Sequence, residues 1–344
     1  MQRYLDSAGI GSDYFSQTNN FQDTLRSPKL DSYLYKYANK LSYRCLSENI
    51  QENYCVCITP AGIERAVISE AARLSKINEK AIAQTEAQDM PLIENKATID
   101  VYDPQSIETL LFYDGIGCKK QAKERKDNPN PTPPDPKASK KVNTDVAVLQ
   151  TTATTFKPIT DGIDQEGHLL YSTMNLLQHH IKQHYGQVTQ TLKMIAITDG
   201  ATSIRNDLHQ FISPGICIIL DWYHLQKKVS SLMTMIAPNK ADKQQHIKDI
   251  NAALWKGNTS EAMTFLDAIK PRNKEKKDEL LGYLSRHQSE IIDYGKRQKV
   301  GKSIGSGRGE KANDTLIANR QKKKGMAWSE KGSKALAILA ANYA

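Results

Sequence analysis

The chain has 344 residues, 25% of them charged, and its mean hydropathy is −0.57. This length fits two or three domains with a full hydrophobic core. No run approaches the roughly 18 apolar residues of a membrane-spanning helix, and the N-terminus lacks the apolar centre of a signal peptide. The five cysteines are irregularly spaced, as expected in a reducing compartment. We therefore expect a cytoplasmic protein with no membrane partner.

Charge is unevenly distributed along the chain. Residues 1–110 carry a net charge of −4, residues 111–269 of +3 and residues 270–344 of +10. A strongly basic block is typical of a protein that binds a polyanion. A solvated lysine-rich surface is the alternative explanation, but nucleic acid is the favoured partner.

The N-terminal region has helical patterns. Apolar residues follow helical spacing over 30–50 and again over 59–77, where Thr59 can cap the helix and Pro60 suits its first turn. Two helices joined by a turn occur in helix-turn-helix DNA-binding domains and also in ordinary bundles. We predict a helical N-terminal region over 1–105, which is a candidate for binding DNA ends.

From residue 106 the pattern becomes that of a sheet. Short apolar or alternating runs predict strands, and helical patterns separate the later ones. The predicted strands are 109–120, 142–153, 167–172, 192–201 and 215–220, and the predicted helices are 173–186, 204–212 and 221–237. The Pro- and Lys-rich segment 123–141 is expected to be an exposed, mobile loop.

The predicted order is β-β-β-α-β-α-β, followed by helices only. This is the order of the RNase H-like fold, here with a helical insertion before its final acidic helix. We therefore predict an α/β protein with an RNase H-like mixed sheet, flanking helices and an all-α insertion. The first part of the core is expected over 106–237, the helical insertion over 238–300, and the catalytic helix with a basic DNA-contacting segment over 301–344.

Two aspartates, each followed by glycine, close predicted strands. Asp114 closes the first strand and Asp199 the fourth, and in an RNase H-like sheet these two strands are adjacent and parallel. Two neighbouring carboxylates repel unless a divalent cation lies between them. Because oxygen ligands select Mg²⁺ or Mn²⁺, and a third carboxylate completes a two-metal site, we expect two such ions here. Asp221 also ends a strand and is the alternative to Asp199.

A glycine-rich stretch points to the third carboxylate. Neither GKS at 301–303 nor the glycines of 305–309 have the spacing of a phosphate-binding loop or a dinucleotide fingerprint. The glycines would instead let the backbone approach a metal site and DNA, and Glu310 follows them at a helix start. A glutamate favoured only by the helix dipole is the alternative, and Asp314 is the rival residue. We call Asp114, Asp199 and Glu310 the acidic triad.

The basic residues near these motifs are the predicted DNA contacts. Lysines 322–324 are expected to meet phosphate groups, which gives affinity without sequence selectivity. The indole of Trp328 lies in the same basic segment and is a candidate for contact with DNA, although a core position is the commoner role of a tryptophan. The full set of predicted DNA contacts is Lys119, Lys120, Arg308, Lys311, Arg320, Lys322, Lys323, Lys324 and Trp328.

These motifs together resemble a known family. The segments YDGIGCKK (113–120), ITDGA…FI…ILDWYH (197–224) and IGSGRGEKAND…RQKKKGMAWSEKGSKA (304–335) are similar to the DDE transposases of bacterial insertion sequences. The closest resemblance is to the ISKra type, which is related to the Mutator-like group. It covers about 109–344, with a weaker similarity over 30–83.

The resemblance implies a function and a site. Asp114, Asp199 and Glu310 would be the metal-binding catalytic residues, with Asp221 and His224, which match a D-x-x-H motif, in supporting roles. The protein would cleave insertion-sequence DNA ends and join them to target DNA by two-metal phosphoryl transfer. It would act as a homo-oligomer on double-stranded DNA in the bacterial nucleoid. The alternatives are an inactive or domesticated DNA-binding derivative and another RNase H-like nuclease.

Overall fold

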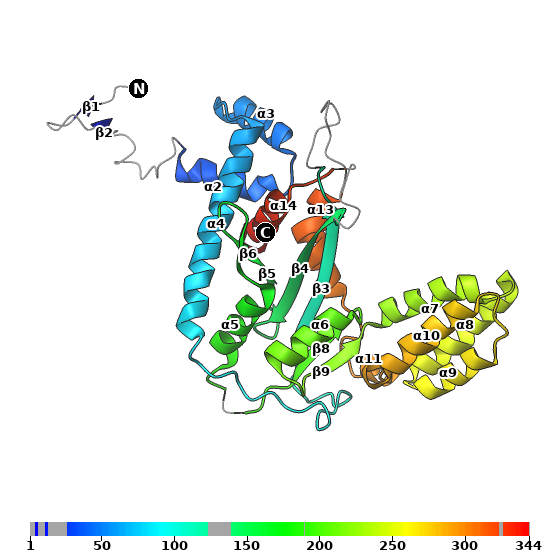
Figure 1. The fold of residues 1–344 in the computed structure, drawn as a ribbon. Helices are drawn as coiled ribbons and strands as arrows, with labels where there is room; N and C mark the ends of the chain where they lie inside the picture. The colour runs from blue at the N-terminus through cyan, green and yellow to red at the C-terminus, as the bar shows by residue number, and fades with distance from the viewer. Residues whose placement is uncertain are drawn as a thin grey trace.

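A five-stranded mixed sheet forms the centre of an α/β protein. The computed structural model describes residues 4–5, 11–12, 26–122, 139–188, 190–322 and 326–343. The strands of this sheet are β3 (Thr109–Lys119), β4 (Lys141–Gln150), β5 (Phe156–Thr160), β8 (Met194–Thr198) and β9 (Cys217–Leu220), in the order β5-β4-β3-β8-β9. Strands β3, β4 and β5 are antiparallel neighbours, whereas β8 and β9 run parallel to β3. Figure 1 shows the sheet between two groups of helices.

The sheet separates two hydrophobic cores. Along β3, Leu111 and Tyr113 face a core that includes α5 (Thr173–Tyr185) and α6 (Thr202–Asp207), which continues as a π-helix, η1 (Leu208–Ile212). Phe112 and Ile116 face the other, larger core. Both β8 and β9 are buried along their whole length, as expected for parallel strands covered on both faces. The alternation places Asp114 on the same face of β3 as Phe112.

The third strand of the sheet differs from the prediction. The sequence predicted 167–172, but the strand beside β4 is β5, which contains Pro158. Proline has no N–H to donate to a neighbouring strand, so the sequence of this segment did not suggest a strand. An edge strand tolerates proline because one of its sides has no neighbouring strand. Residues Leu169–Tyr171 form β7, which pairs with β6 (Gly162–Ile163) in a separate two-stranded sheet.

The N-terminal helices pack against the C-terminal helix. The predicted helix over 30–50 is in fact two helices, α2 (Pro28–Ala38) and α3 (Tyr43–Tyr54), because the Ser42 side chain caps a new helix start. Helix α4 (Pro60–Thr85) starts at the Thr59 cap as predicted. It runs along one side of the molecule and contacts α14 (Glu330–Tyr343) (Figure 1). Strands β1 (Tyr4–Leu5) and β2 (Gly11–Ser12) form a small antiparallel pair.

Helices alone fill the described chain between β9 and the glycine-rich stretch. They are α7 (Trp222–Ile236), α8 (Lys240–Trp255), α9 (Thr259–Ala268), α10 (Lys274–Arg286), the 3₁₀ helix η2 (Gln288–Glu290) and α11 (Tyr294–Lys299). Helices α7 to α10 form a group on the opposite side of Figure 1 from α4. The chain then returns to the sheet through α12 (Gly307–Asn313), the π-helix η3 (Asp314–Ala318) and α13 (Asn319–Gln321). No helix in the described ranges is long and apolar enough to cross a membrane.

Candidate active site

Asp114 and Asp199 lie at equivalent positions on neighbouring parallel strands. Phe112 of β3 pairs with Ile197 of β8, and each aspartate comes two residues after its member of this pair. Both side chains are half-buried. Burial raises the pKa of Asp114, and the negative charges of Asp199 and Glu310 raise it further. Asp199 directly follows β8 as predicted, but Asp114 does not close its strand, because β3 stays paired with β4 as far as Lys119. The two aspartates are nevertheless close enough to interact electrostatically.

The turn after β8 requires glycine. Gly200 has a φ of +87°, and a Cβ there would lie 2.7 Å from Leu220 Cδ1 and 2.9 Å from His287 Cε1. The turn lets the Ala201 N–H donate to Asp199 Oδ1 over 2.8 Å. Backbone strain and lack of space both exclude a side chain at this position, so the direction of the Asp199 carboxylate depends on Gly200.

Helix α12 brings Glu310 to the same place. A Cβ on Gly309 would lie 3.0 Å from Phe112 Cβ, so the first turn of α12 packs directly on β3. One turn later, Asn313 Nδ2 donates to Asp114 Oδ2 over 2.7 Å. The Glu310 side chain is 54% exposed, and its Oε1 lies 3.9 Å from His224 Nδ1. Asp314, the rival of Glu310, is exposed at the start of η3.

Asp221 has a structural role that the sequence did not reveal. It is 1% exposed and caps α7, since its Oδ1 accepts from the His224 N–H over 2.8 Å. Its Oδ2 accepts from the Ser306 backbone N–H and, over 2.6 Å, from Ser306 Oγ. Burial would raise the pKa of Asp221, but the hydrogen bonds from His224 and Ser306 outweigh it and lower this pKa to about 2. Both carboxylate oxygens are thus occupied by protein donors.

His224 lies among these acidic groups. Its Nδ1 is 3.5 Å from Asp221 Oδ1. The interaction with the Asp221 carboxylate raises the pKa of His224 despite partial burial, and the charges of Asp199 and Glu310 add to the effect. A raised pKa favours the protonated form of the imidazole, so the surroundings of His224 favour a positive charge beside the acidic triad.

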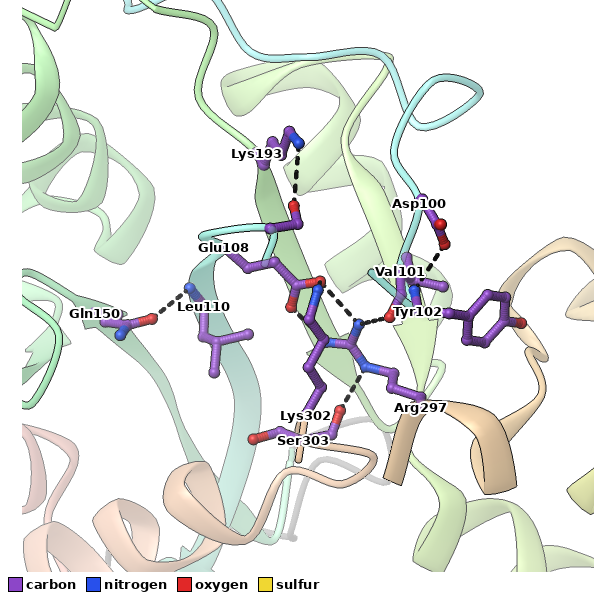
Figure 2. A network of polar contacts seen from close by, with 11 residues as sticks. Asp100, Val101, Tyr102, Glu108, Leu110, Gln150, Lys193, Arg297, Lys302 and Ser303 are labelled. Atoms are coloured by element: carbon purple, nitrogen blue, oxygen red, sulfur yellow. Dashed lines mark hydrogen bonds and ion pairs between the residues drawn. The ribbon is translucent and has the colours of Figure 1, made fainter. Parts of the chain in front are cut away.

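A buried ion-pair network holds the chain that leads to α12. Arg297 is fully buried and donates to both oxygens of Glu108, over 3.0 and 2.7 Å, and to the carbonyl oxygens of Val101 and Ser303. Lys302 Nζ lies 2.6 Å from Glu108 Oε1. Figure 2 shows these side chains converging on Glu108. Because Glu108 directly precedes β3, the network ties the strand that carries Asp114 to the segment that leads to Glu310.

The predicted DNA contacts fall into four groups, of which the buried residues Arg320 and Trp328 are described below. Lys119, Arg308, Lys311 and Lys322 are exposed. The Arg308 guanidinium lies 4.2 Å from the centre of the Phe156 ring. Lys120 pairs with Glu330 over 3.1 Å. Lys323 and Lys324 lie outside the described residues, as does most of the predicted loop 123–141.

Arg320 and Trp328 do not fit the prediction of DNA contact. Arg320 is 6% exposed, donates to the Ala38 carbonyl over 3.1 Å, and lies over the rings of Tyr43 and Trp328. The Trp328 indole is 9% exposed and donates to the Gln321 carbonyl over 3.0 Å. These side chains join the N-terminal helices to the C-terminal segment. The basic composition of the segment concealed this packing role.

The acidic triad is more open than a site for one tightly held ion. Among the described residues, a single group offers three ligand atoms within 4.8 Å of one another, and it consists of Asp164, Glu166 and His168. That group belongs to the turn between β6 and β7, where Lys331 Nζ donates to the Gln165 carbonyl over 3.2 Å. The ligand atoms of a two-metal site lie further apart than those around one ion, since the two ions are themselves about 3.5–4 Å apart.

The C-terminal half of the chain matches a known protein family. Residues 172–344 match the uncharacterised protein family UPF0236, and the chain belongs to this family. The matched segment contains Asp199, Asp221, His224 and Glu310, and it begins after Asp114. No curated protein matches the chain.

Proposed function

We propose that the protein is a metal-dependent transposase that cuts DNA ends and joins them to target DNA. The observation that carries the proposal is the sheet order β5-β4-β3-β8-β9, in which Asp114, within β3, and Asp199, directly after β8, lie at equivalent positions of neighbouring parallel strands. This strand arrangement supports the RNase H-like core that the proposal requires. Glu310, from a helix packed on the same strand, supplies the third carboxylate.

The donor set fits hard divalent cations. Carboxylates offer oxygen ligands only, which suits Mg²⁺ or Mn²⁺. The raised pKa of Asp114, caused by burial and by the charges of Asp199 and Glu310, indicates repulsion that cations between these groups relieve. Asp114, Asp199 and Glu310 would hold two ions, whose chemistry is to activate the attacking oxygen and stabilise the leaving oxygen of a phosphodiester.

The surrounding residues have distinct roles in this proposal. Asn313 orients the Asp114 carboxylate through its 2.7 Å hydrogen bond. Asp221 fixes the start of α7, and hence the place of His224, by capping the helix. Protonated His224 offers a cationic N–H donor to a phosphate oxygen, the charge-assisted contact that phosphate recognition favours. Because both carboxylate oxygens of Asp221 accept hydrogen bonds from protein groups, we assign Asp221 a supporting role. Asp199 is the proposed metal ligand.

The basic surface supports a DNA partner. Arg308 and Lys311 flank Glu310 on α12 and are exposed, and Lys322 lies further along the same helical segment. Cations beside the acidic triad can bind the phosphate backbone while the carboxylates hold metal. The proposed substrate is double-stranded DNA, bound by a homo-oligomer in the cytoplasm of a bacterium.

The test is strand cleavage and joining on labelled DNA that carries the inverted repeats expected to flank the gene. With Mg²⁺ or Mn²⁺, the parent protein should cut and join, whereas Asp199→Asn and Glu310→Gln should bind the DNA equally but lose both reactions. A large loss of both reactions is expected, because each change removes one negative charge from the metal site and weakens its hold on divalent cations. Cleavage that survives Asp199→Asn and disappears in Asp221→Asn would move the second metal ligand to Asp221. A parent protein that binds ends but never cuts them would be a DNA-binding derivative.

A further inference from the structure

A buried polar cluster lies directly behind the Asp199 turn. His287, between α10 and η2, is 1% exposed, and its Nδ1 lies 2.6 Å from Glu290 Oε2. Arg205 of α6 pairs with the other oxygen of Glu290 over 2.6 Å. Arg205 Nη2 also lies 2.8 Å from His287 Nδ1. Glu290 and Arg205 therefore both hold the ring at Nδ1, and Nε2 is the other ring nitrogen. Arg205 follows the Asp199 turn and Glu290 belongs to the helical insertion. The cluster therefore joins the Asp199 turn to the helical insertion.

The other edge of the imidazole faces Gly200. A Cβ on Gly200 would lie 2.9 Å from His287 Cε1 and 3.3 Å from Nε2, so only glycine lets the ring approach this closely. Within the part of the chain that the structure describes, Nε2 is buried and has no hydrogen-bond partner. Native proteins rarely leave a buried polar atom unpaired, and such atoms gather at functional sites. This nitrogen lies against the residue that follows Asp199.

Tyr283 extends the contact towards the site. Its ring packs on His287 with a centroid distance of 4.5 Å. Tyr283 also lines a surface depression together with Asp199, Gly200 and His224. The helical insertion thus reaches the Asp199 turn from behind through His287 and forms part of the wall beside the carboxylate through Tyr283.

We propose that His287 is a positioning residue for Asp199, so that the helical insertion helps to build the metal site. Glu290 and Arg205 fix the ring, the ring supports the Gly200 turn, and the turn sets the direction of the Asp199 carboxylate. Outer-shell groups that orient metal ligands are worth about 10- to 100-fold in metal affinity, and His287 would act in this way through the Gly200 turn. The inference rests on the proposed function, because it assumes that Asp199 binds metal.

The experiment measures Mn²⁺ binding to the full chain without DNA, by electron paramagnetic resonance of free Mn²⁺. Mn²⁺ binding that is lost in Asp199→Asn is counted as binding at the proposed site. This comparison leaves out ions bound elsewhere, including at Asp164, Glu166 and His168. His287→Gln should weaken binding at the proposed site about 10- to 100-fold, and so should Glu290→Gln, which keeps the shape of the side chain. The matched control is Glu279→Gln, because Glu279 lies on α10 of the insertion but pairs at the surface with Lys228 and Lys276.

The outcomes separate this inference from the proposed function. Weaker Mn²⁺ binding in both variants, with affinity for DNA and thermal midpoint close to the parent, supports a positioning role. Unchanged Mn²⁺ affinity in Glu290→Gln overturns it, even if His287→Gln fails to fold. If the parent shows no Mn²⁺ binding that Asp199→Asn removes, the proposed metal site fails and this inference fails with it.

Discussion

Replacing Glu108 with glutamine should strongly destabilise the protein. Glu108 faces two cations, Arg297 with no exposed surface and Lys302 with 11% exposed. The substitution keeps the size of the side chain but leaves both positive charges without their carboxylate. Breaking a buried ion pair by removing one partner costs about 3–5 kcal/mol. We expect the upper part of this range, because glutamine keeps one acceptor oxygen but presents an NH₂ group, which is a donor, where Arg297 or Lys302 needs an acceptor.

The assay is urea unfolding followed by tryptophan fluorescence. Trp222 and Trp255 pack against Tyr294 at the start of α11, so they report on the region that Arg297 anchors. Glu279→Gln is the control, since its surface pairs with Lys228 and Lys276 should contribute less than about 1 kcal/mol. A loss below about 1 kcal/mol in Glu108→Gln would refute the view that this network holds the approach to α12.

Two further substitution pairs test the packing of α12 and the basic surface. Gly309→Ala should lower the free energy of unfolding by about 1–3 kcal/mol, since its Cβ would crowd Phe112, whereas Gly307→Ala, which meets open space, should not. Equal effects in unfolding experiments would contradict the close approach of α12 to β3. Lys322→Ala should reduce the salt dependence of DNA binding by about 0.9 log units, whereas Arg320→Ala should lower stability and leave the salt slope unchanged. A reduced slope in Arg320→Ala would return that residue to the DNA surface.

Local patterns were sufficient to find most of the sheet. Strands β8 and β9 are continuous apolar runs, so their ends, and with them Asp199 and Asp221, could be located from the sequence. Strand β5 could not be located from the sequence, because Pro158 cannot donate a hydrogen bond to a neighbouring strand. Only the pairing with β4 shows that this segment is an edge strand, where a proline is tolerated. The break between α2 and α3 was also missed, since the apolar spacing continues through it.

Long-range contacts explain the errors at the candidate site. The sequence predicted Arg320 as a DNA contact because its neighbours in the chain are basic. Its actual partners, Ala38 and Tyr43, lie far away in the chain. The support that Ser306 gives Asp221 likewise joins distant segments. The spacing of apolar residues describes a single helix or strand and does not show what packs against it. The local sequence therefore cannot distinguish a buried basic side chain such as that of Arg320 from an exposed one.

The route of the chain has a consequence for the order in which this site can form during synthesis. Asp114 and Asp199 belong to the sheet, whereas Glu310 follows Asp199 by 111 residues, most of them in helices. At about 5–20 residues per second, a ribosome needs roughly 6–22 seconds to add that stretch. A nascent chain therefore has time to pair its strands and fold α7 to α10 before the third carboxylate exists, and premature termination in this interval leaves two aspartates without Glu310.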